Sequence, residues 1–220
     1  MPTDAADRPA DPGSADLATP VLLIAMPQVQ DPFFHKSVVL LLHHSEEGSV
    51  GLIVNRPTEL AVREILAGME LEWQGDAGAP TWFGGPVQPQ IGTVLFSSMG
   101  EPSTDSGETA DDPSTGSGHG IEAALVLAGG ISVTQHVGDL GRLAGAPPER
   151  FRLLLGYAGW GEGQLLEEIL RNDWLTAPVD ADLVFAASPE EAWTGALRSV
   201  GVNPASLPSW TAAGGDGSAN

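Results

Sequence analysis

The sequence contains no cysteine, and its nine lysine and arginine residues include a single lysine, Lys36. The absence of cysteine excludes disulfide bonds, thiolate catalysis and cysteine metal sites. Because 29 aspartates and glutamates oppose the nine cations, the formal net charge is −20. Such a surface repels nucleic acid and anionic lipid, and the sequence shows no basic cluster that would offset this repulsion. We therefore expect neither a nucleic-acid partner nor a membrane partner.

Long apolar runs are also lacking. The longest run that could insert into a bilayer, residues 21–26, is far too short to span one. The segment before it is acidic, with Arg8 as its only basic side chain, whereas a signal peptide has a basic start and a longer apolar core. The apolar content of 42% is typical of soluble globular proteins. Together these features predict a cytoplasmic protein.

The chain is long enough for one sizeable core, and we expect a single domain over residues 19–210. Residues 1–18 lack hydrophobic periodicity and predict a disordered acidic tail. Residues 100–120 hold five acids and no large apolar side chain, which predicts a disordered acidic insert between two strands. Residues 211–220 are expected to form a loose tail.

Apolar runs of strand length, bounded by turn residues, predict strands or extended segments at 21–26, 37–44, 49–55, 81–83, 91–97, 123–128, 131–135, 174–177 and 183–187. Apolar residues at helical spacing predict helices over 58–69, capped by Thr58, and over 139–144. A third helix is predicted to begin at Ser188, because Pro189 and Glu191 follow it as a capping box requires, and to end near Gly201. The segment 31–34 predicts a turn that places Phe33 and Phe34 in the core.

The sequence between Arg152 and residue 172 is predicted to form a strand, a glycine-rich turn and a helix. An apolar run follows Arg152, glycines occupy positions 156, 159, 161 and 163, and the helical spacing covers residues 162–172. A nucleoside-triphosphate loop is disfavoured because Glu162 stands where its lysine belongs. The glycine spacing is one residue short of the dinucleotide fingerprint, and no serine stands at the centre of a nucleophile elbow. The favoured interpretation is a tight turn in which glycine serves geometry alone.

No metal or cofactor site is predicted. The five histidines lack the spacings of zinc sites, and His43 and His44 are adjacent in a strand, so they point to opposite faces. The acidic pairs at 46–47 and 167–168 are interpreted as solvated. Arg56, at the end of a buried strand, could hold a carboxylate or phosphate, although an intramolecular pair with Asp31 or a helix carboxylate is favoured.

Several motifs in order carry a resemblance to a known family: LLIAMP (22–27), QDPFF (30–34), GLIVNRP (51–57), GGPV (84–87) and GYAGWG (156–161). With these motifs the chain resembles the YqgE/AlgH family of bacterial proteins over roughly residues 20–202, the acidic insert excepted. The resemblance implies an α/β (α+β) fold in which a mixed, bent β-sheet forms a pseudo-barrel and helices pack outside. It implies little about activity, because the family is largely uncharacterised and offers no catalytic residues to carry over. Its name reflects in part a link to the regulation of alginate synthesis.

Three functional hypotheses follow. The first is a non-enzymatic module that binds a small ligand or a protein partner, with a regulatory role. The second is an enzyme acting on a small anionic metabolite, and the third is a transcriptional regulator, which the net charge disfavours. Binding residues collect in loops at strand ends, so we expect one concave site there, while partner identity and oligomeric state stay open. The predicted site comprises Asn55, Arg56, Gly84, Gly85, Gly159, Trp160 and Gly161.

Overall fold

The structure, a computed structural model, describes residues 17–97, 124–186 and 188–208. The insert and the C-terminal tail predicted above lie outside these residues, as does the N-terminal tail except for its last two residues. The described strands are β1 (Val21–Ala25), β2 (Val38–Ser45), β3 (Gly48–Ile53), β4 (Pro57–Ala61), β5 (Pro80–Phe83), β6 (Val87–Ser97), β7 (Leu125–Val126), β8 (Ile131–Thr134), β9 (Phe151–Trp160) and β10 (Trp174–Ala177). The described helices are α1 (Val62–Ala67), α2 (Val137–Gly145), α3 (Gln164–Leu170), α4 (Ala181–Val184) and α5 (Pro189–Ser199), with short 3-10 turns at Ala128–Gly130 and Pro204–Ser206.

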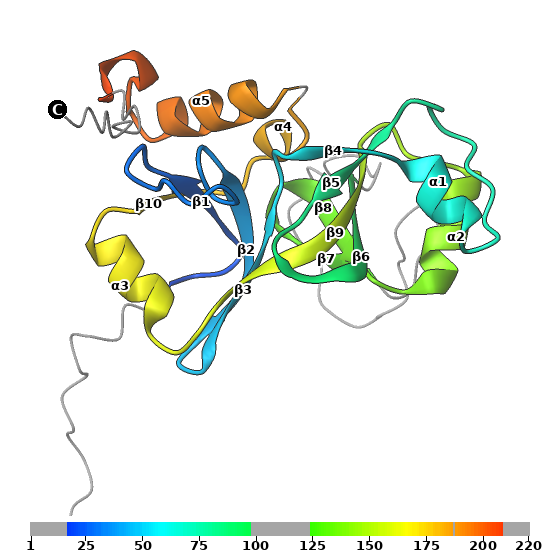
Figure 1. Ribbon diagram of the computed structural model, residues 1–220, viewed down its shortest axis with the longest axis horizontal. Coiled ribbons are helices and arrows are strands. Elements are labelled where there is room, and N and C mark those ends of the chain that lie inside the picture. The colour runs from blue at the N-terminus through cyan, green and yellow to red at the C-terminus, as the bar shows by residue number, and fades with distance from the viewer. Residues whose placement is uncertain (1–16, 98–123, 187, 209–220) are drawn as a thin grey trace, which may run out of the picture.

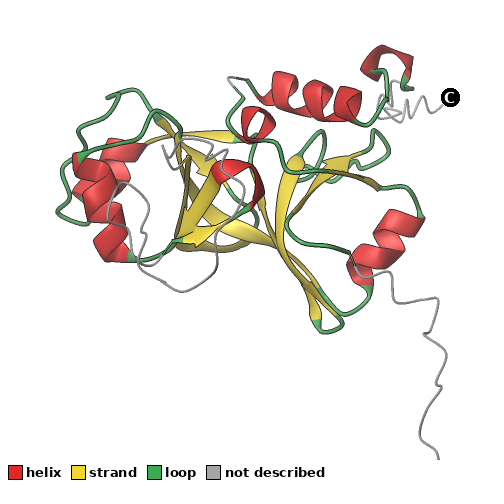
Figure 2. Ribbon diagram, turned by 180° about the vertical axis from the view of Figure 1, so that it is seen from behind, coloured by secondary structure: helices red, strands yellow, loops and turns green. Residues whose placement is uncertain are grey.

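The strands form one curled sheet in the order β10-β1-β2-β3-β9-β6-β8-β7, with β4 and β5 joined to it through β9. All described pairings are antiparallel except that of β5 with β9, so the sheet is mixed. It curls into a half-barrel, and the helices lie outside the strands at both ends and along one side (Figures 1 and 2). The predicted α+β fold with a bent mixed sheet is confirmed.

Strand β1 and the first four residues of β2 are buried on both faces, which explains why their sequences are continuous apolar runs. Leu22 and Ile24 belong to a cluster with Trp193 of α5, while Leu23 belongs to a second cluster with Leu165 of α3. In Figure 1 these two helices lie on different sides of β1 and β2. The far half of the molecule has its own cluster, in which α1 and α2 pack on β6 and β9.

The helix predicted over residues 58–69 is wrong in its first turn. Residues 57–61 form β4, in which Pro57 pairs with Trp82 and Ala61 pairs with Pro80. The hydroxyls of Thr58 and Thr81 lie 2.6 Å apart, so Thr58 makes a cross-strand hydrogen bond instead of capping a helix. Helix α1 therefore begins four residues later, at Val62. Strand pairing has overridden the local helical spacing.

The glycine turn predicted after residue 155 is also wrong in its first half, because β9 continues through Gly156 to Trp160. Here Tyr157 pairs with Val87 and Gly159 pairs with Val50, so neighbouring strands hold this part of β9 in the sheet. A φ of +72° at Gly156 accommodates the local irregularity. The turn is confined to residues 161–163, and α3 follows at Gln164.

The C-terminal elements differ in one respect from the prediction. Residues 181–184 form helix α4 rather than an extended segment, and the Asp180 carboxylate caps it by accepting from the backbone N–H of Asp182. The capping box of α5 is confirmed, because Ser188 accepts from the N–H of Glu191 and the Glu191 carboxylate accepts from the N–H of Ser188. Gly201 follows α5 with a φ of +78°, as its predicted capping role requires. Within the three described ranges, no helix has the length and hydrophobicity needed to cross a membrane.

Candidate functional site

A cavity of about 540 Å³ lies where the β1–β2 loop, the segment joining β3 to β4, the end of β5 and the start of α5 meet. We call it the Arg56 cavity. Its walls combine prolines, aromatic rings, a histidine, an asparagine, two cationic side chains and one carboxylate: Pro32, Phe33, His35, Lys36, Asn55, Arg56, Pro57, Phe83, Pro189 and Glu190. A volume of this size lies within the range of small-molecule sites.

The β1–β2 loop divides its two phenylalanines between two places. The Asp31 carboxylate accepts from the backbone N–H of Phe33, which tightens the turn. Phe34 packs inward, with its ring centroid 5.8 Å from that of Trp174. Phe33 is instead 46% exposed and stacks on Phe83 at 5.6 Å, forming an aromatic wall of the Arg56 cavity. The prediction that both rings enter the core is therefore wrong for Phe33.

Asn55 is buried and joins three segments at the base of the cavity. Its Oδ1 accepts from the backbone N–H of Val38 at 2.8 Å. Its Nδ2 donates to the carbonyl oxygens of Lys36 at 2.9 Å and Pro189 at 3.1 Å. Backbone groups thus use both N–H donors of the amide and one of the two lone pairs on its oxygen. Asn55 acts as a clamp that positions Lys36, Arg56 and the start of α5.

Arg56 presents a half-buried guanidinium to the cavity. One terminal nitrogen donates to the His35 carbonyl oxygen at 2.5 Å, and the buried Nε–H has no acceptor among the described residues. Burial lowers the pKa of Arg56, and the charge of Asp31 raises it in part. The described residues place no carboxylate within ion-pair distance of Arg56, so the predicted intramolecular pair is replaced by a carbonyl contact and a longer-range attraction to Asp31. The Nε–H is enclosed, but the terminal N–H groups that do not bond to His35 are left for an anion.

A second arginine, Arg152, is buried in the fold, and the sequence assigns it no role because it is followed by an apolar run that predicts an ordinary buried strand. The Arg152 side chain, near the start of β9, donates to the carbonyl oxygens of Val54 and Ala186, and its guanidinium carbon lies 3.5 Å from the centre of the Trp82 ring. Burial lowers the pKa of Arg152 to about 9, which leaves the side chain charged at pH 7. The carbonyl oxygens and the indole face take the place of a counter-ion. Nothing in the local pattern distinguishes such an arginine from one at a strand end.

The structure divides the seven predicted site residues between different places. Asn55 and Arg56 line the Arg56 cavity, whereas Gly159 and Trp160 line a separate cavity of about 330 Å³ together with Phe34. Gly161 lies in the turn after β9, where its N–H donates to the Gln164 side chain. The seven residues therefore do not share one cavity.

Gly84 and Gly85 are buried where β5 meets β9. A Cβ atom at Gly84 would lie 2.3 Å from the Gly156 carbonyl oxygen, and one at Gly85 would lie 2.1 Å from the Tyr157 carbonyl carbon. The N–H of Gly84 donates to Leu155, and its carbonyl accepts from the N–H of Ile53. Close approach of backbones accounts for glycine at both positions.

Glu168 belongs to the pair interpreted from sequence as solvated, and that interpretation is wrong for this residue. Its Oε2 accepts from the indole N–H groups of both Trp160, at 2.9 Å, and Trp174, at 2.8 Å. Its Oε1 accepts from Gln164 at 2.9 Å. The carboxylate therefore anchors α3 to the two indoles, which lie in sequence positions that give no local signal of this contact.

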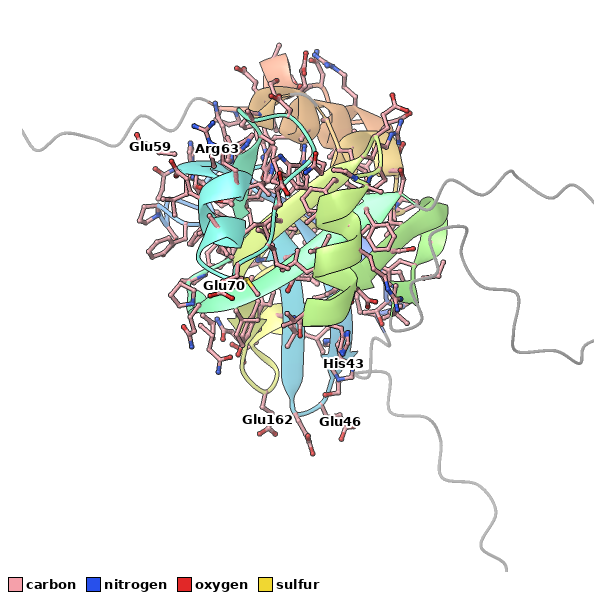
Figure 3. The ribbon with its side chains drawn as sticks, turned by 90° about the vertical axis from the view of Figure 1, so that its right-hand side faces the viewer. His43, Glu46, Glu59, Arg63, Glu70 and Glu162 are labelled. Atoms are coloured by element: carbon pink, nitrogen blue, oxygen red, sulfur yellow. The ribbon has the colours of Figure 1, made fainter. Side chains whose placement is uncertain are left out.

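The charged end of the molecule opposite α5 offers no comparable arrangement. His43 and Glu46 of the β2–β3 hairpin and Glu162 of the β9–α3 turn lie at the same end and point outward (Figure 3). The neighbouring His44 ring hydrogen-bonds to the Ser49 hydroxyl. Within the part of the chain that the structure describes, no group of three or more His, Asp or Glu side chains could hold a metal ion.

Comparison with known proteins gives consistent matches over most of the chain. A family model described as AlgH-like matches residues 22–205. A UPF0301 protein of Ralstonia nicotianae is 38% identical over 201 residues, which cover 90% of this chain and 96% of the relative. A UPF0301 protein of Azoarcus is 36% identical over 199 residues, with the same coverage of 90% and 96%.

Two solved structures share the fold. The solution structure of the AlgH protein from Pseudomonas aeruginosa is 34% identical, with a TM-score of 0.61, and the match covers 83% of this chain and 88% of that one. The crystal structure of a protein from Corynebacterium diphtheriae has a TM-score of 0.61 at 21% identity, covering 81% of this chain and 85% of that one. The second match concerns the fold alone.

Proposed function

This chain belongs to the AlgH-like family, and from that premise we propose that it is a cytoplasmic binding module whose ligand occupies the Arg56 cavity. The ligand carries one anionic group, a carboxylate or a phosphate, joined to a flat apolar part. One observation carries this proposal: an arginine whose guanidinium has one hydrogen-bond acceptor among the described residues faces a cavity beside an exposed aromatic stack, in a protein whose net charge is −20.

The two parts of the ligand follow from two parts of the cavity. A guanidinium binds carboxylate or phosphate oxygens through forked hydrogen bonds, and the partial burial of Arg56 strengthens them by excluding water. Lys36 adds a second positive charge on the same wall. Phe33 and Phe83 offer an apolar surface to a flat group, and covering Phe33 would remove apolar area from water.

The N-terminus of α5 is not needed for this proposal. Pro189 has no N–H, and the Ser188 hydroxyl already accepts from the N–H of Glu191. Glu190 also borders the cavity and would repel an anion placed close to the helix start. The anion is therefore expected on the Arg56 side of the cavity.

Two other functions from the sequence remain as alternatives. An enzyme acting on a small anionic metabolite would use the same cavity, and would be recognised because it consumes the ligand that it binds. A regulatory role would act through ligand occupancy, since the charge of −20 disfavours direct contact with DNA.

A dye titration tests the proposal. The probe is 8-anilino-1-naphthalenesulfonate, which joins a sulfonate to flat aromatic rings. Arg56→Gln is expected to weaken dye binding about tenfold, the effect of losing one charge-assisted hydrogen bond. Arg56→Lys is expected to restore part of the affinity because it keeps the charge without the fork. Arg63→Gln is the matched control, because Arg63 lies on α1 and does not line the cavity.

Competition identifies the chemistry that the cavity recognises. We expect 2-naphthoate to displace the dye and uncharged 2-naphthalenemethanol to displace it much less. Equal displacement by the two compounds, or equal dye affinity of the Arg56→Gln and Arg63→Gln variants, would show that the cavity does not bind anions.

A further inference from the structure

A second cavity, of about 500 Å³, continues the Arg56 cavity along α5. The two cavities share His35, Lys36 and Glu190, so they adjoin, and we call the two together the α5 groove. Beyond these shared residues, the second cavity is lined by Trp193, Thr194 and Arg198 of α5, by the segment that follows the helix, and by Pro27. The groove is therefore longer than a site for one small molecule.

The α5 groove gathers an unusual share of the positive charge. The described ranges contain eight lysines and arginines. Three of them form ion pairs and a fourth is buried against carbonyl groups and an indole: Arg142, Arg150, Arg171 and Arg152. Of the four others, Lys36, Arg56 and Arg198 line the groove, against one lining carboxylate, Glu190. A positive strip thus crosses a strongly acidic protein.

The uncharged part of the groove is rigid and apolar. Six prolines line it, together with aromatic rings: Pro27, Pro32, Pro57, Pro189, Pro204 and Pro208. Proline has no N–H group and a fixed φ, so these walls offer few competing hydrogen-bond donors and lose little entropy when a ligand binds. Grooves with aromatic walls of this kind suit an extended peptide backbone.

We infer that the α5 groove binds an extended acidic peptide segment of a partner protein. This inference rests on the proposed function, because one peptide carboxylate and an adjacent apolar side chain occupy the Arg56 cavity. The segment then passes Lys36, whose Nζ lies 5.3 Å from the centre of the Trp193 ring, and places a second carboxylate at Arg198. Two anchoring charges at the ends of the groove fix the direction and register of the peptide.

Charge complementarity favours a peptide over a nucleic acid. A peptide of a few residues can keep its carboxylates within the positive strip, since electrostatic interactions are screened over about 8 Å at physiological ionic strength. A nucleic-acid strand carries a charge about every 3.4 Å and would extend beyond the strip over the acidic surface.

Fluorescence polarisation with the full-length protein tests the inference. The probe is a peptide with carboxyfluorescein on its N-terminal amine, carboxyfluorescein-Glu-Phe-Glu-Glu-Leu-Glu-amide, and the matched control peptide carries the same label and has glutamine at every glutamate. We expect the acidic peptide to bind at least tenfold more tightly than its glutamine counterpart. Arg198→Gln should weaken peptide binding about fivefold, as expected for a charge near the surface, and leave the affinity for the naphthalenesulfonate dye unchanged. Arg63→Gln should change neither affinity.

The two dissociation constants separate failure of this inference from failure of the proposed function. If Arg198→Gln leaves the peptide affinity unchanged while Arg56→Gln weakens dye binding, the proposed ligand site in the Arg56 cavity is supported and peptide binding along the α5 groove is refuted. If Arg56→Gln alters neither the dye nor the peptide affinity, both proposals are overturned. Undetectable peptide binding at about 1 mM protein, or tighter binding of an oligothymidylate than of the acidic peptide, also overturns the groove.

Discussion

Replacing Asn55 with alanine removes the clamp at the base of the Arg56 cavity and should be strongly destabilising. The substitution deletes one acceptor and two donors that are used by backbone groups of Val38, Lys36 and Pro189. These groups belong to the start of β2, the β1–β2 loop and the start of α5. One side chain therefore holds together three segments that are far apart in the sequence.

The magnitude follows from what each backbone group loses. Val38 is fully buried, so its N–H group should bear the full cost of a buried unsatisfied donor, about 1–3 kcal/mol. The hydrogen bonds to the carbonyls of Lys36 and Pro189 are only partly buried and both residues line the cavity, so water should replace the amide there and each lost bond should cost about 0.5 kcal/mol. The expected loss of unfolding free energy is about 3 kcal/mol, or about 6–12 °C in Tm for a domain of this size.

Urea unfolding followed by circular dichroism measures this loss. Asn55→Asp should be at least as destabilising, because it keeps the acceptor for Val38 but turns a carboxylate oxygen towards two carbonyl groups. Asn203→Ala is the matched control: its side chain accepts a single exposed N–H bond from Ala205, and its loss should cost less than about 1 kcal/mol. If Asn55→Ala costs no more than Asn203→Ala, the clamp does not stabilise the fold.

Three further predictions give sharp outcomes. Lys36 has a left-handed φ of +54°, so Lys36→Gly should relieve backbone strain and raise the unfolding free energy by about 1 kcal/mol. The same substitution removes a positive charge from the Arg56 cavity and should weaken dye binding severalfold. A loss of stability would contradict this account of strain. Gly85→Ala should prevent folding, because the added Cβ would lie 2.1 Å from the β9 backbone. Gly163→Ala, which has open space around its Cβ, is the control and should cost only about 1–2 kcal/mol of unfolding free energy. A soluble, well-folded Gly85→Ala protein in an expression and circular-dichroism assay would contradict the close approach of β5 and β9. Glu168→Leu should cost about 2–4 kcal/mol in urea unfolding because it leaves two buried indole N–H groups without an acceptor, and Glu168→Gln, which keeps an acceptor oxygen, should cost less.

The parts of the fold that the sequence predicts are those governed by local chemistry or by burial on both faces. Residues 21–26 and 37–44 could be recognised as strands because a strand covered on both faces needs an apolar side chain at nearly every position. The start of α5 could be recognised because the Ser188 capping box is complete within four residues. The resemblance to a known family added the curl of the sheet, which no single segment encodes.

The errors arise where a distant strand decides the conformation. Thr58 fits a helix cap in isolation, but its hydroxyl meets Thr81 across a strand pair. Glycine lowers the preference for a strand, yet Gly156 and Gly159 lie in β9 because β3 and β6 pair with it on its two sides. Local propensity is weaker than these pairings, so reading the sequence segment by segment could not find them.

The candidate site was found only in part for a similar reason. Asn55 and Arg56 stand at a strand end, where the sequence offers a signal, and both line the Arg56 cavity. Phe33 and Glu190 come from segments far from them in the chain, so only the folded structure brings them together. Glycine next to a strand end has the same appearance whether it serves a ligand or a backbone contact. For Gly84 the structure shows the backbone contact, and a ligand contact stays a prediction.

Strand β9 has a consequence for the order in which the chain can fold during synthesis. It pairs with β3, β5 and β6, and β1 must also wait for β10, since Leu22 pairs with Ala177. Much of the N-terminal half therefore leaves the ribosome before its partners exist, with β1 and β3 each still unpaired along one edge. Non-local pairings of this kind slow folding and prolong the exposure of strand edges. Premature termination anywhere before β9 would release a fragment that cannot close its sheet, which makes such fragments substrates for chaperones and proteases.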